Sequence, residues 1–184
     1  MIGIDEVGRG AWAGPLLVVA VRQKNELPKG VKDSKRLSKK SRIKFINDIK
    51  TSCDIGCGWV KPIEIDKLGL TSAMALAVER ALDEINAKIN EKIIMDGNIN
   101  YCHSKYKNVE CVIKADDSHP IVSVASIYAK VTRDKFMTEL AKEFLFFDFE
   151  KNVGYGTLKH RQALKQFGAT KYHRLSYKPV KEYI

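Results

Sequence analysis

Carboxylates follow three apolar segments of this sequence, each at the point where a strand is expected to end. Asp5 and Glu6 stand together after the first segment, Asp96 follows the second and Asp116 follows the third. Ligand sites of α/β proteins gather at the carboxyl ends of strands, so we expect these side chains to share one site. Adjacent strand residues point to opposite faces, so Asp5 and Glu6 can share it only if their strand is already ending. Gly8 supports such an ending.

Metal-dependent phosphodiester hydrolysis is the chemistry that four such acids could perform. Clustered carboxylates repel one another unless cations neutralise them. Oxygen-only ligands favour Mg²⁺ or Mn²⁺ over zinc, and two such ions can activate water and stabilise a leaving oxygen. Taken singly, each acid could instead be a strand-end or helix-capping residue. The repeated placement favours Asp5, Glu6, Asp96 and Asp116 as catalytic residues and metal ligands.

A Gly-Arg-Gly turn at residues 8–10 follows the first acidic pair. Its glycines carry no Cβ, so the backbone of the turn can approach a bulky ligand closely. Together with Ala13, the segment formally fits the dinucleotide fingerprint G-x-G-x-x-G/A, which requires a helix directly after the glycines. Here Pro15 and the apolar run 16–21 predict a strand instead, and the acidic pair would repel a pyrophosphate. A dinucleotide site is therefore not expected.

Alternating apolar runs and amphipathic segments predict the elements that position these residues. Strands are predicted at 1–5, 16–23, 53–61, 92–96 and 109–114, and helices at 38–52, 71–89, 120–144 and 157–167, with a short helical turn from Pro62. This order indicates an α/β fold with a mixed sheet and helices on both faces. We find no linker or repeat, so residues 1–184 are expected to form a single catalytic domain. Its last part, 157–184, is expected to be a short helical and irregular segment that contacts substrate.

The charge of the chain suits a polyanionic partner. Lys and Arg number 32 against 22 Asp and Glu, which gives a formal net charge of +10. Such an excess is typical of nucleic-acid-binding proteins, although a merely basic protein is the alternative. The basic residues gather in 29–44 and again in 159–181, in segments predicted to be loops or helix starts. Side chains there could reach phosphates.

The cysteines and the chain start indicate a cytoplasmic location. Cys53, Cys57, Cys102 and Cys111 form no C-x-x-C pair and have no zinc-finger histidine. They are expected to be small buried side chains in a reducing compartment, rather than a metal site or a disulfide. The sequence shows no secretory signal and no apolar run long enough to cross a membrane.

Several motifs, in their order and spacing, resemble the ribonuclease HII family, the type 2 ribonucleases H. The resemblance covers nearly the whole chain, from Gly3 to about Val180. The matching motifs are Gly3–Gly10, Asp33–Ser38, Met95–Asn98, Lys114–Asp116, Ser126–Asp134, Gly154–Gly156 and His173–Arg174.

The resemblance implies a ribonuclease H-like fold, with about five strands in a mixed sheet. It assigns the four carboxylates to catalysis with two divalent ions, Mg²⁺ or Mn²⁺. The implied reaction is endonucleolytic hydrolysis of the RNA strand of RNA–DNA hybrids, leaving 3′-hydroxyl and 5′-phosphate ends. The family also nicks duplex DNA on the 5′ side of a single embedded ribonucleotide.

The resemblance also suggests which residues contact the substrate. An enzyme that selects a ribonucleotide must recognise the 2′-hydroxyl. In the family, a tyrosine matching Tyr155 packs on the sugar beside the Gly-Arg-Gly segment, whereas without the resemblance this residue could be a loop tyrosine packed on the core. A lysine matching Lys35 contacts phosphate, and Arg36, Lys39 and Lys40 would be weaker contacts. The expected substrate-binding residues are Gly8, Arg9, Gly10, Ser34, Lys35, Tyr155 and Arg174.

Some positions depart from the family pattern. Ala115 stands where many members have glycine, so the loop carrying Asp116 is expected to be less free, and Asp117 is the alternative fourth ligand. Asn152 and Val153 replace a common His-Lys pair, so one phosphate contact is expected to be lost. The N-terminal extension of the type 3 relatives and the C-terminal helical extension of some members have no counterpart. This predicts weaker or more salt-sensitive binding.

Two other functions compete with a ribonuclease. One is a different nuclease or resolvase on the same fold, and the other is a nucleic-acid-binding protein with an inactive metal site. Retention of all four acids argues against the inactive protein, and Gly-Arg-Gly together with Tyr155 argues for a ribonuclease over another nuclease. No sequence feature requires a dimer, so a monomer is expected.

Overall fold

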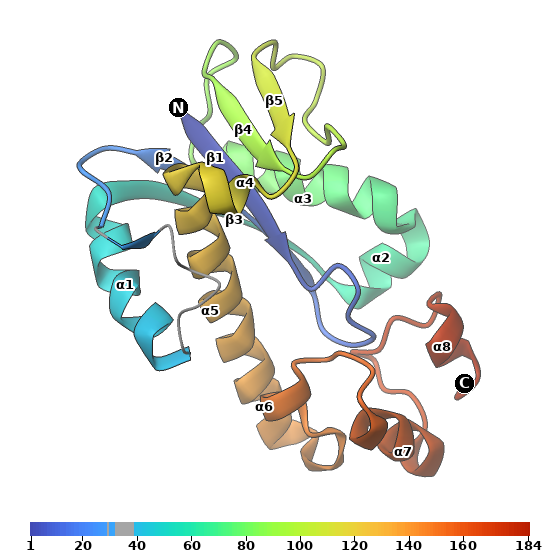
Figure 1. Cartoon of the computed structure of the whole chain (residues 1–184). Helices are drawn as coiled ribbons and strands as arrows, with labels where there is room; N and C mark the ends of the chain where they lie inside the picture. The colour runs from blue at the N-terminus through green and yellow to red at the C-terminus, as the bar shows by residue number, and fades with distance from the viewer. Residues whose placement is uncertain (29, 32–38) are drawn as a thin grey trace.

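A mixed sheet forms the centre of the computed structural model, which describes residues 1–28, 30, 31 and 39–184, without the side chains of 39 and 40 (Figure 1). Within the described residues the sheet has five strands in the order β3-β2-β1-β4-β5. β1 pairs antiparallel with β2 and parallel with β4, β2 pairs antiparallel with β3, and β4 pairs parallel with β5. The strands are β1 Ile2–Val7, β2 Leu16–Gln23, β3 Cys53–Val60, β4 Ile93–Asp96 and β5 Val109–Val112.

Helices cover both faces of the sheet, as the sequence predicted. Figure 1 shows α3 (Leu70–Glu84) on one face and α5 (Pro120–Glu143) on the other, where α1 (Lys39–Ser52) also packs. The first six residues of β2 are all buried, as expected for a central strand covered on both sides. The shorter helices are α2 Pro62–Leu68, α4 Ala115–Ser118, α6 Phe149–Asn152, α7 Leu158–Phe167 and α8 Lys178–Lys181.

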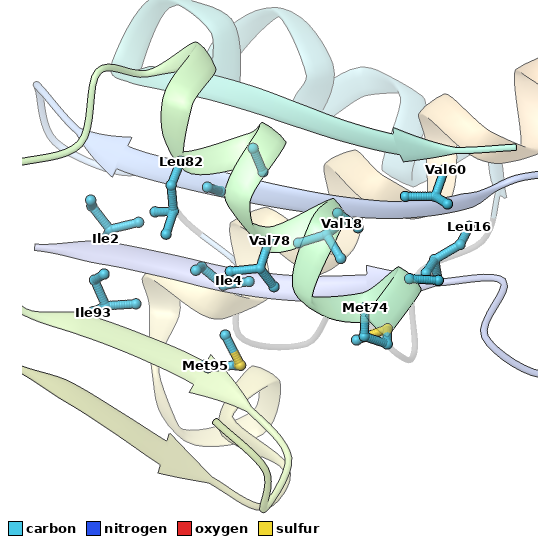
Figure 2. Packing of buried hydrophobic residues seen from close by; sticks show 14 of the residues in the cluster. Ile2, Ile4, Leu16, Val18, Val60, Met74, Val78, Leu82, Ile93 and Met95 are labelled. Atoms are coloured by element: carbon cyan, nitrogen blue, oxygen red, sulfur yellow. The ribbon is translucent and has the colours of Figure 1, made fainter. Parts of the chain in front are cut away.

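The core on the α3 face is aliphatic. Figure 2 shows Val78 and Met74 of α3 against Ile4 of β1 and Val18 of β2, all of them buried. On the opposite face α5 lies very close to β1, because a Cβ on Gly3 would be 2.6 Å from the backbone carbon of Ile121. Both faces of β1 are thus held tightly. This strand carries the first acidic pair.

A third cluster joins the C-terminal helices to the end of α5. Phe149 and Leu164, from α6 and α7, pack with Met137 of α5 and with Ala13, which follows the Gly-Arg-Gly turn. In Figure 1 the C-terminal segment lies beside the loop that leaves β1. Residues far apart in sequence therefore meet next to the turn.

The predicted element boundaries are close to the observed ones, with several differences. The first strand was predicted to end at residue 5, but β1 continues to Val7 and pairs with β2 throughout, so the strand ending expected at Asp5 and Glu6 is wrong. The helix predicted over 71–89 ends at Glu84, and Asn86 just beyond it has a left-handed φ of 50°. The segment predicted as a loop over 147–156 contains the short helix α6. The predicted cap Ser38 lies outside the described residues. None of the described helices is long and apolar enough to cross a membrane.

Candidate active site

The four predicted acids lie at one end of the sheet, here called the carboxylate edge (Asp5, Glu6, Asp96 and Asp116). β1 and β4 run parallel with Ile4 opposite Met95, so Asp5 and Asp96 occupy corresponding positions at adjacent strand ends. The backbone N–H of Ala115 donates to Asp96 Oδ1 at 2.6 Å, and this places the first turn of α4 against the end of β4. Asp116, the next residue, is consequently brought to the same edge.

Negative charge is concentrated at this edge. Asp5 is only 8% exposed. Burial, and then the nearby charges of Glu6 and Asp96, raise the pKa of the Asp5 carboxyl to about 8, against a hydrogen bond from Ser126 of α5 that lowers it. Burial also raises the pKa of Glu6, while Arg9, whose Nη1 lies 3.9 Å from Glu6 Oε1, opposes this rise. A bound cation would favour the ionised form of these carboxyls and so lower their pKa values.

The donor chemistry of the carboxylate edge fits a hard divalent cation. All four side chains offer carboxylate oxygens, the ligands that Mg²⁺ and Mn²⁺ prefer. Within the described part of the chain, however, no three His, Cys, Asp or Glu side chains converge closely enough to hold an ion as they stand. Asp116 is 5% exposed at the edge whereas Asp117 is exposed to solvent, which favours Asp116 as the fourth acid.

The Gly-Arg-Gly turn at residues 8–10 leaves β1 directly beside this edge. Gly8 has φ of +83°, and a Cβ there would lie 2.2 Å from Nε of Arg133, so only glycine fits. Gly10 is exposed, and a Cβ on it would lie 3.9 Å from Cε1 of Tyr155. The structure thus brings Tyr155, which is 39% exposed, next to the turn.

The loop of Tyr155 is fixed to the chain that follows the turn. The carbonyl of Gly154 accepts from the backbone N–H groups of Trp12 at 2.8 Å and Ala13 at 3.1 Å. Gly154 has φ of +88°, and a Cβ there would lie 2.2 Å from the Ala13 carbonyl oxygen. Turn and tyrosine are therefore parts of one packed unit.

Comparison with models of protein families identifies the family of this chain. The model described as ribonuclease HII matches residues 2–180. The chain belongs to the ribonuclease HII family.

Two ribonucleases HII match it over nearly their whole length. The ribonuclease HII of Pelagibacter ubique is 41% identical over 185 residues, which is 100% of this chain and 98% of the relative. Among solved structures, the PCNA:RNase HII complex from Archaeoglobus fulgidus matches with a TM-score of 0.83 at 27% identity, over 99% of this chain and 95% of that one. Bst-RNase HIII in complex with Mn²⁺ shares the fold, with a TM-score of 0.75 at 22% identity, over 99% of this chain and 68% of that one.

Family membership establishes the general activity and the fold. The chain is a hydrolase, a ribonuclease H endonuclease of a divalent-metal-dependent family that acts on RNA–DNA substrates. The mixed five-stranded sheet with flanking helices is the ribonuclease H-like fold that the resemblance implied.

One expected substrate contact, Arg174, is wrong. Arg174 is 0% exposed, so its guanidinium cannot touch a nucleic acid. Its Nε and Nη2 donate to the Gly14 carbonyl at 3.1 and 3.0 Å, and its Nη1 donates to the Arg9 carbonyl at 2.9 Å. The residue was placed in a basic cluster of the sequence, but both it and the adjacent His173 are buried.

The departures from the ribonuclease HII pattern have structural reasons. The loop carrying Asp116 was expected to be less free with Ala115 in place of glycine. The left-handed residue is Lys114, at φ of 58°, and Ala115 begins α4, where a Cβ is tolerated. Asn152 is buried, donates to the Phe147 carbonyl at 2.6 Å and accepts from the Gly154 N–H at 2.8 Å. It shapes the Tyr155 loop and offers nothing to a phosphate.

The sequence analysis missed three residues whose hydrogen bonds position parts of the site. Ser126 hydrogen-bonds Asp5, Tyr177 donates its hydroxyl to the Arg9 carbonyl at 2.7 Å, and the fully buried Arg133 donates to the carbonyls of residues 13, 15 and 153. Of these, Ser126 and Arg133 fell within a recognised motif but received no role. The expected contacts Ser34 and Lys35 lie outside the described residues, as do Arg36 and the side chains of 39 and 40.

Proposed function

We propose that this protein hydrolyses the RNA strand of RNA–DNA hybrids and nicks duplex DNA on the 5′ side of single embedded ribonucleotides. Its products would carry 3′-hydroxyl and 5′-phosphate ends. The observation that carries the proposal is the position of Tyr155 beside Gly10, next to the carboxylate edge. Tyr155, which can contact one sugar, therefore lies next to the carboxylates that can hydrolyse one phosphodiester.

Asp5, Glu6, Asp96 and Asp116 are the residues proposed to hold two divalent ions, Mg²⁺ or Mn²⁺. Two such ions activate a water and stabilise the leaving oxygen of a phosphodiester. The raised pKa values of Asp5 and Glu6 support the assignment, because they arise from burial of these carboxyls and then from the neighbouring acidic charges, both of which a cation would offset. The Mn²⁺ bound to Bst-RNase HIII, a protein of the same fold, is consistent with it.

The Gly-Arg-Gly turn and Tyr155 would select the ribonucleotide. Gly10 is exposed and has no Cβ, so the backbone of the turn can approach a ribose closely there and can hydrogen-bond its 2′-hydroxyl. The Tyr155 ring would pack on the sugar from the opposite side. A deoxyribose lacks this hydroxyl and would leave the polar backbone groups of the turn without that hydrogen bond.

Phosphate contacts would come from basic residues around this centre. We assign Ser34 and Lys35 to the phosphates on the ground of the family motif alone. In the C-terminal segment 157–184, Lys159, Arg161 and Lys165 of α7 are exposed and available to a duplex. We further propose that the enzyme works as a cytoplasmic monomer and forms one domain over residues 1–184.

Three duplexes of one sequence test the proposal: all-DNA, DNA with one ribonucleotide, and a long RNA–DNA hybrid. Each is incubated with Mg²⁺, with Mn²⁺ and with a chelator. We expect both ribonucleotide-containing duplexes to be cut only with a metal ion, and the all-DNA duplex to remain intact. Cutting of all-DNA duplex at a similar rate would instead indicate a different nuclease on this fold.

A further inference from the structure

We propose that His173 and Arg174 are positioning residues that set the spacing between the Gly-Arg-Gly turn and Tyr155. Arg174 holds the turn, and His173 holds Tyr155 through His160. The inference rests on the proposed function, because this spacing has a purpose only if the turn and the tyrosine select a ribonucleotide together.

On the turn side, two donors converge on one carbonyl. Arg174 Nη1 and the Tyr177 hydroxyl both donate to the Arg9 carbonyl, at 2.9 and 2.7 Å. Arg174 Nη1 also donates to the Tyr177 oxygen at 2.9 Å, while the other side of the guanidinium holds Gly14. The fork of Arg174 therefore ties both ends of the segment 9–14. The Arg9 side chain remains exposed.

On the tyrosine side, the hydrogen bonds allow one set of histidine tautomers. The Thr170 N–H donates to His173 Nδ1 at 2.9 Å, so the His173 proton must be on Nε2. That proton points to His160 Nε2 at 3.0 Å, which must then accept it. The His160 proton is therefore on Nδ1, 2.9 Å from the Tyr155 carbonyl, to which it donates. Two neutral, buried rings thus link Thr170 to Tyr155.

The two links start from neighbouring residues of one short segment. The backbone of this segment also pairs with the chain after the turn, through a bridge between Ala13 and His173 and a 2.8 Å bond from Arg174 N–H to the Trp12 carbonyl. Because 173 and 174 are covalently joined, the turn and Tyr155 cannot shift independently. A displacement of about 1 Å in a reacting geometry can cost about a hundredfold in rate.

Weakening either link should reduce cleavage of the single-ribonucleotide duplex more than cleavage of the long hybrid. A duplex with one ribonucleotide presents a single 2′-hydroxyl in a single register, so cleavage depends fully on the spacing. A long hybrid offers many ribonucleotides and an A-form shape along its length. The informative quantity is therefore the ratio of kcat/KM on the single-ribonucleotide duplex to kcat/KM on the long hybrid.

The test measures this ratio for Arg174→Lys, Tyr177→Phe and His173→Phe, together with thermal unfolding. Lysine keeps the charge of Arg174 but cannot reach residues 9 and 14 at once. Phenylalanine at 177 removes one hydroxyl only, and at 173 it leaves His160 without its donor. We expect the ratio to fall about tenfold for the changes at 174 and 173 and about threefold for Tyr177→Phe.

Val78→Ala is the matched control, because Val78 is buried in the core on the α3 face. It should lower stability and leave the ratio unchanged. Unchanged ratios in the three variants, a fall on one side only, or an equal fall in Val78→Ala would each overturn the inference. If Arg174→Lys prevents folding, Tyr177→Phe tests the turn side in its place. If His173→Phe prevents folding, His160→Phe tests the tyrosine side, because it removes the donor to the Tyr155 carbonyl. Failure of the unaltered protein to nick would overturn the proposed function as well, whereas normal nicking with unchanged ratios overturns this inference alone.

Discussion

The carboxylate edge and the turn–tyrosine pair (residues 8–10 with Tyr155) lie side by side but are positioned in different ways. The acids sit on β1, at the end of β4 and at the start of α4, so main-chain pairing of adjacent strands and the first turn of α4 place them. The turn and Tyr155 are held by Arg133 and Arg174, which are far away in sequence and bind backbone carbonyls. Cleavage chemistry and ribonucleotide selection should therefore be separable by mutation.

The largest effect is expected at the carboxylate edge. Asp5→Asn should lower cleavage of both ribonucleotide-containing substrates by at least about a hundredfold, because a charged group at the reacting centre is lost. The fold should persist, since the amide has the same shape and its neutrality suits a buried site where the carboxyl pKa is about 8. Steady-state cleavage rates measure the loss of activity, and thermal unfolding in chelator measures whether the fold persists. Loss of only one of the two activities would contradict the separation of the regions.

Tyr155→Ala should act on selection instead. We expect roughly a tenfold loss, about 1.4 kcal/mol, on the single-ribonucleotide duplex and a smaller loss on the long hybrid. The 39% exposed ring should contribute little to stability. Tyr155→Phe keeps the ring and serves as the control that should retain most activity. Equal losses on both substrates would count against the role given to Tyr155.

Two glycines of the turn give a matched pair. Gly10→Ala should fold normally, since its Cβ would meet nothing closer than 3.9 Å, but the added methyl group should reduce cleavage of the single-ribonucleotide duplex several-fold by narrowing the gap to Tyr155. Gly8→Ala should lower the melting temperature, because its Cβ would lie 2.2 Å from Arg133 Nε at a φ of +83°. Calorimetry and cleavage assays separate the two. The reverse pattern would mean that the turn is positioned differently.

The smallest expected effect is on the pH dependence of stability, which has opposite signs in the two regions. Burial and then the neighbouring His160 lower the pKa of His173 to about 4. The unfolded chain binds that proton near 6.5, so stability should fall as pH falls from about 6.5 to about 4. At the carboxylate edge, Asp5 has its pKa raised from 3.8 to about 8, so without metal its contribution should weaken as pH rises through that range.

Denaturant unfolding in chelator across this pH range separates the two contributions. Asp5→Asn should remove the loss at high pH, and His173→Phe should reduce the loss at low pH. If neither variant altered the pH dependence, the two groups would not have the ionisation behaviour described above.

The sequence predicted the parts of the molecule that depend on local pattern. Short apolar runs rich in β-branched residues marked the strands, and acids at their ends marked the carboxylate edge, because strand propensity and helix capping are short-range effects. The burial of Arg174 was not predictable, since it depends on carbonyls near residues 9 and 14. α3 ends early because Asn86, just after the C-cap, has a left-handed φ of 50°. Asparagine favours this conformation, so the sequence held a stop signal that the prediction did not use.

The position and chemistry of one cut test the central claim most directly. A duplex with one ribonucleotide, labelled at either end of that strand, is cleaved in Mg²⁺ and its products are identified by mass. The account predicts a nick on the 5′ side of the ribonucleotide, with a 3′-hydroxyl on the DNA fragment and a 5′-phosphate on the ribonucleotide. A break on the 3′ side that leaves a cyclic phosphate would contradict it, because the 2′-hydroxyl would then be the nucleophile instead of water.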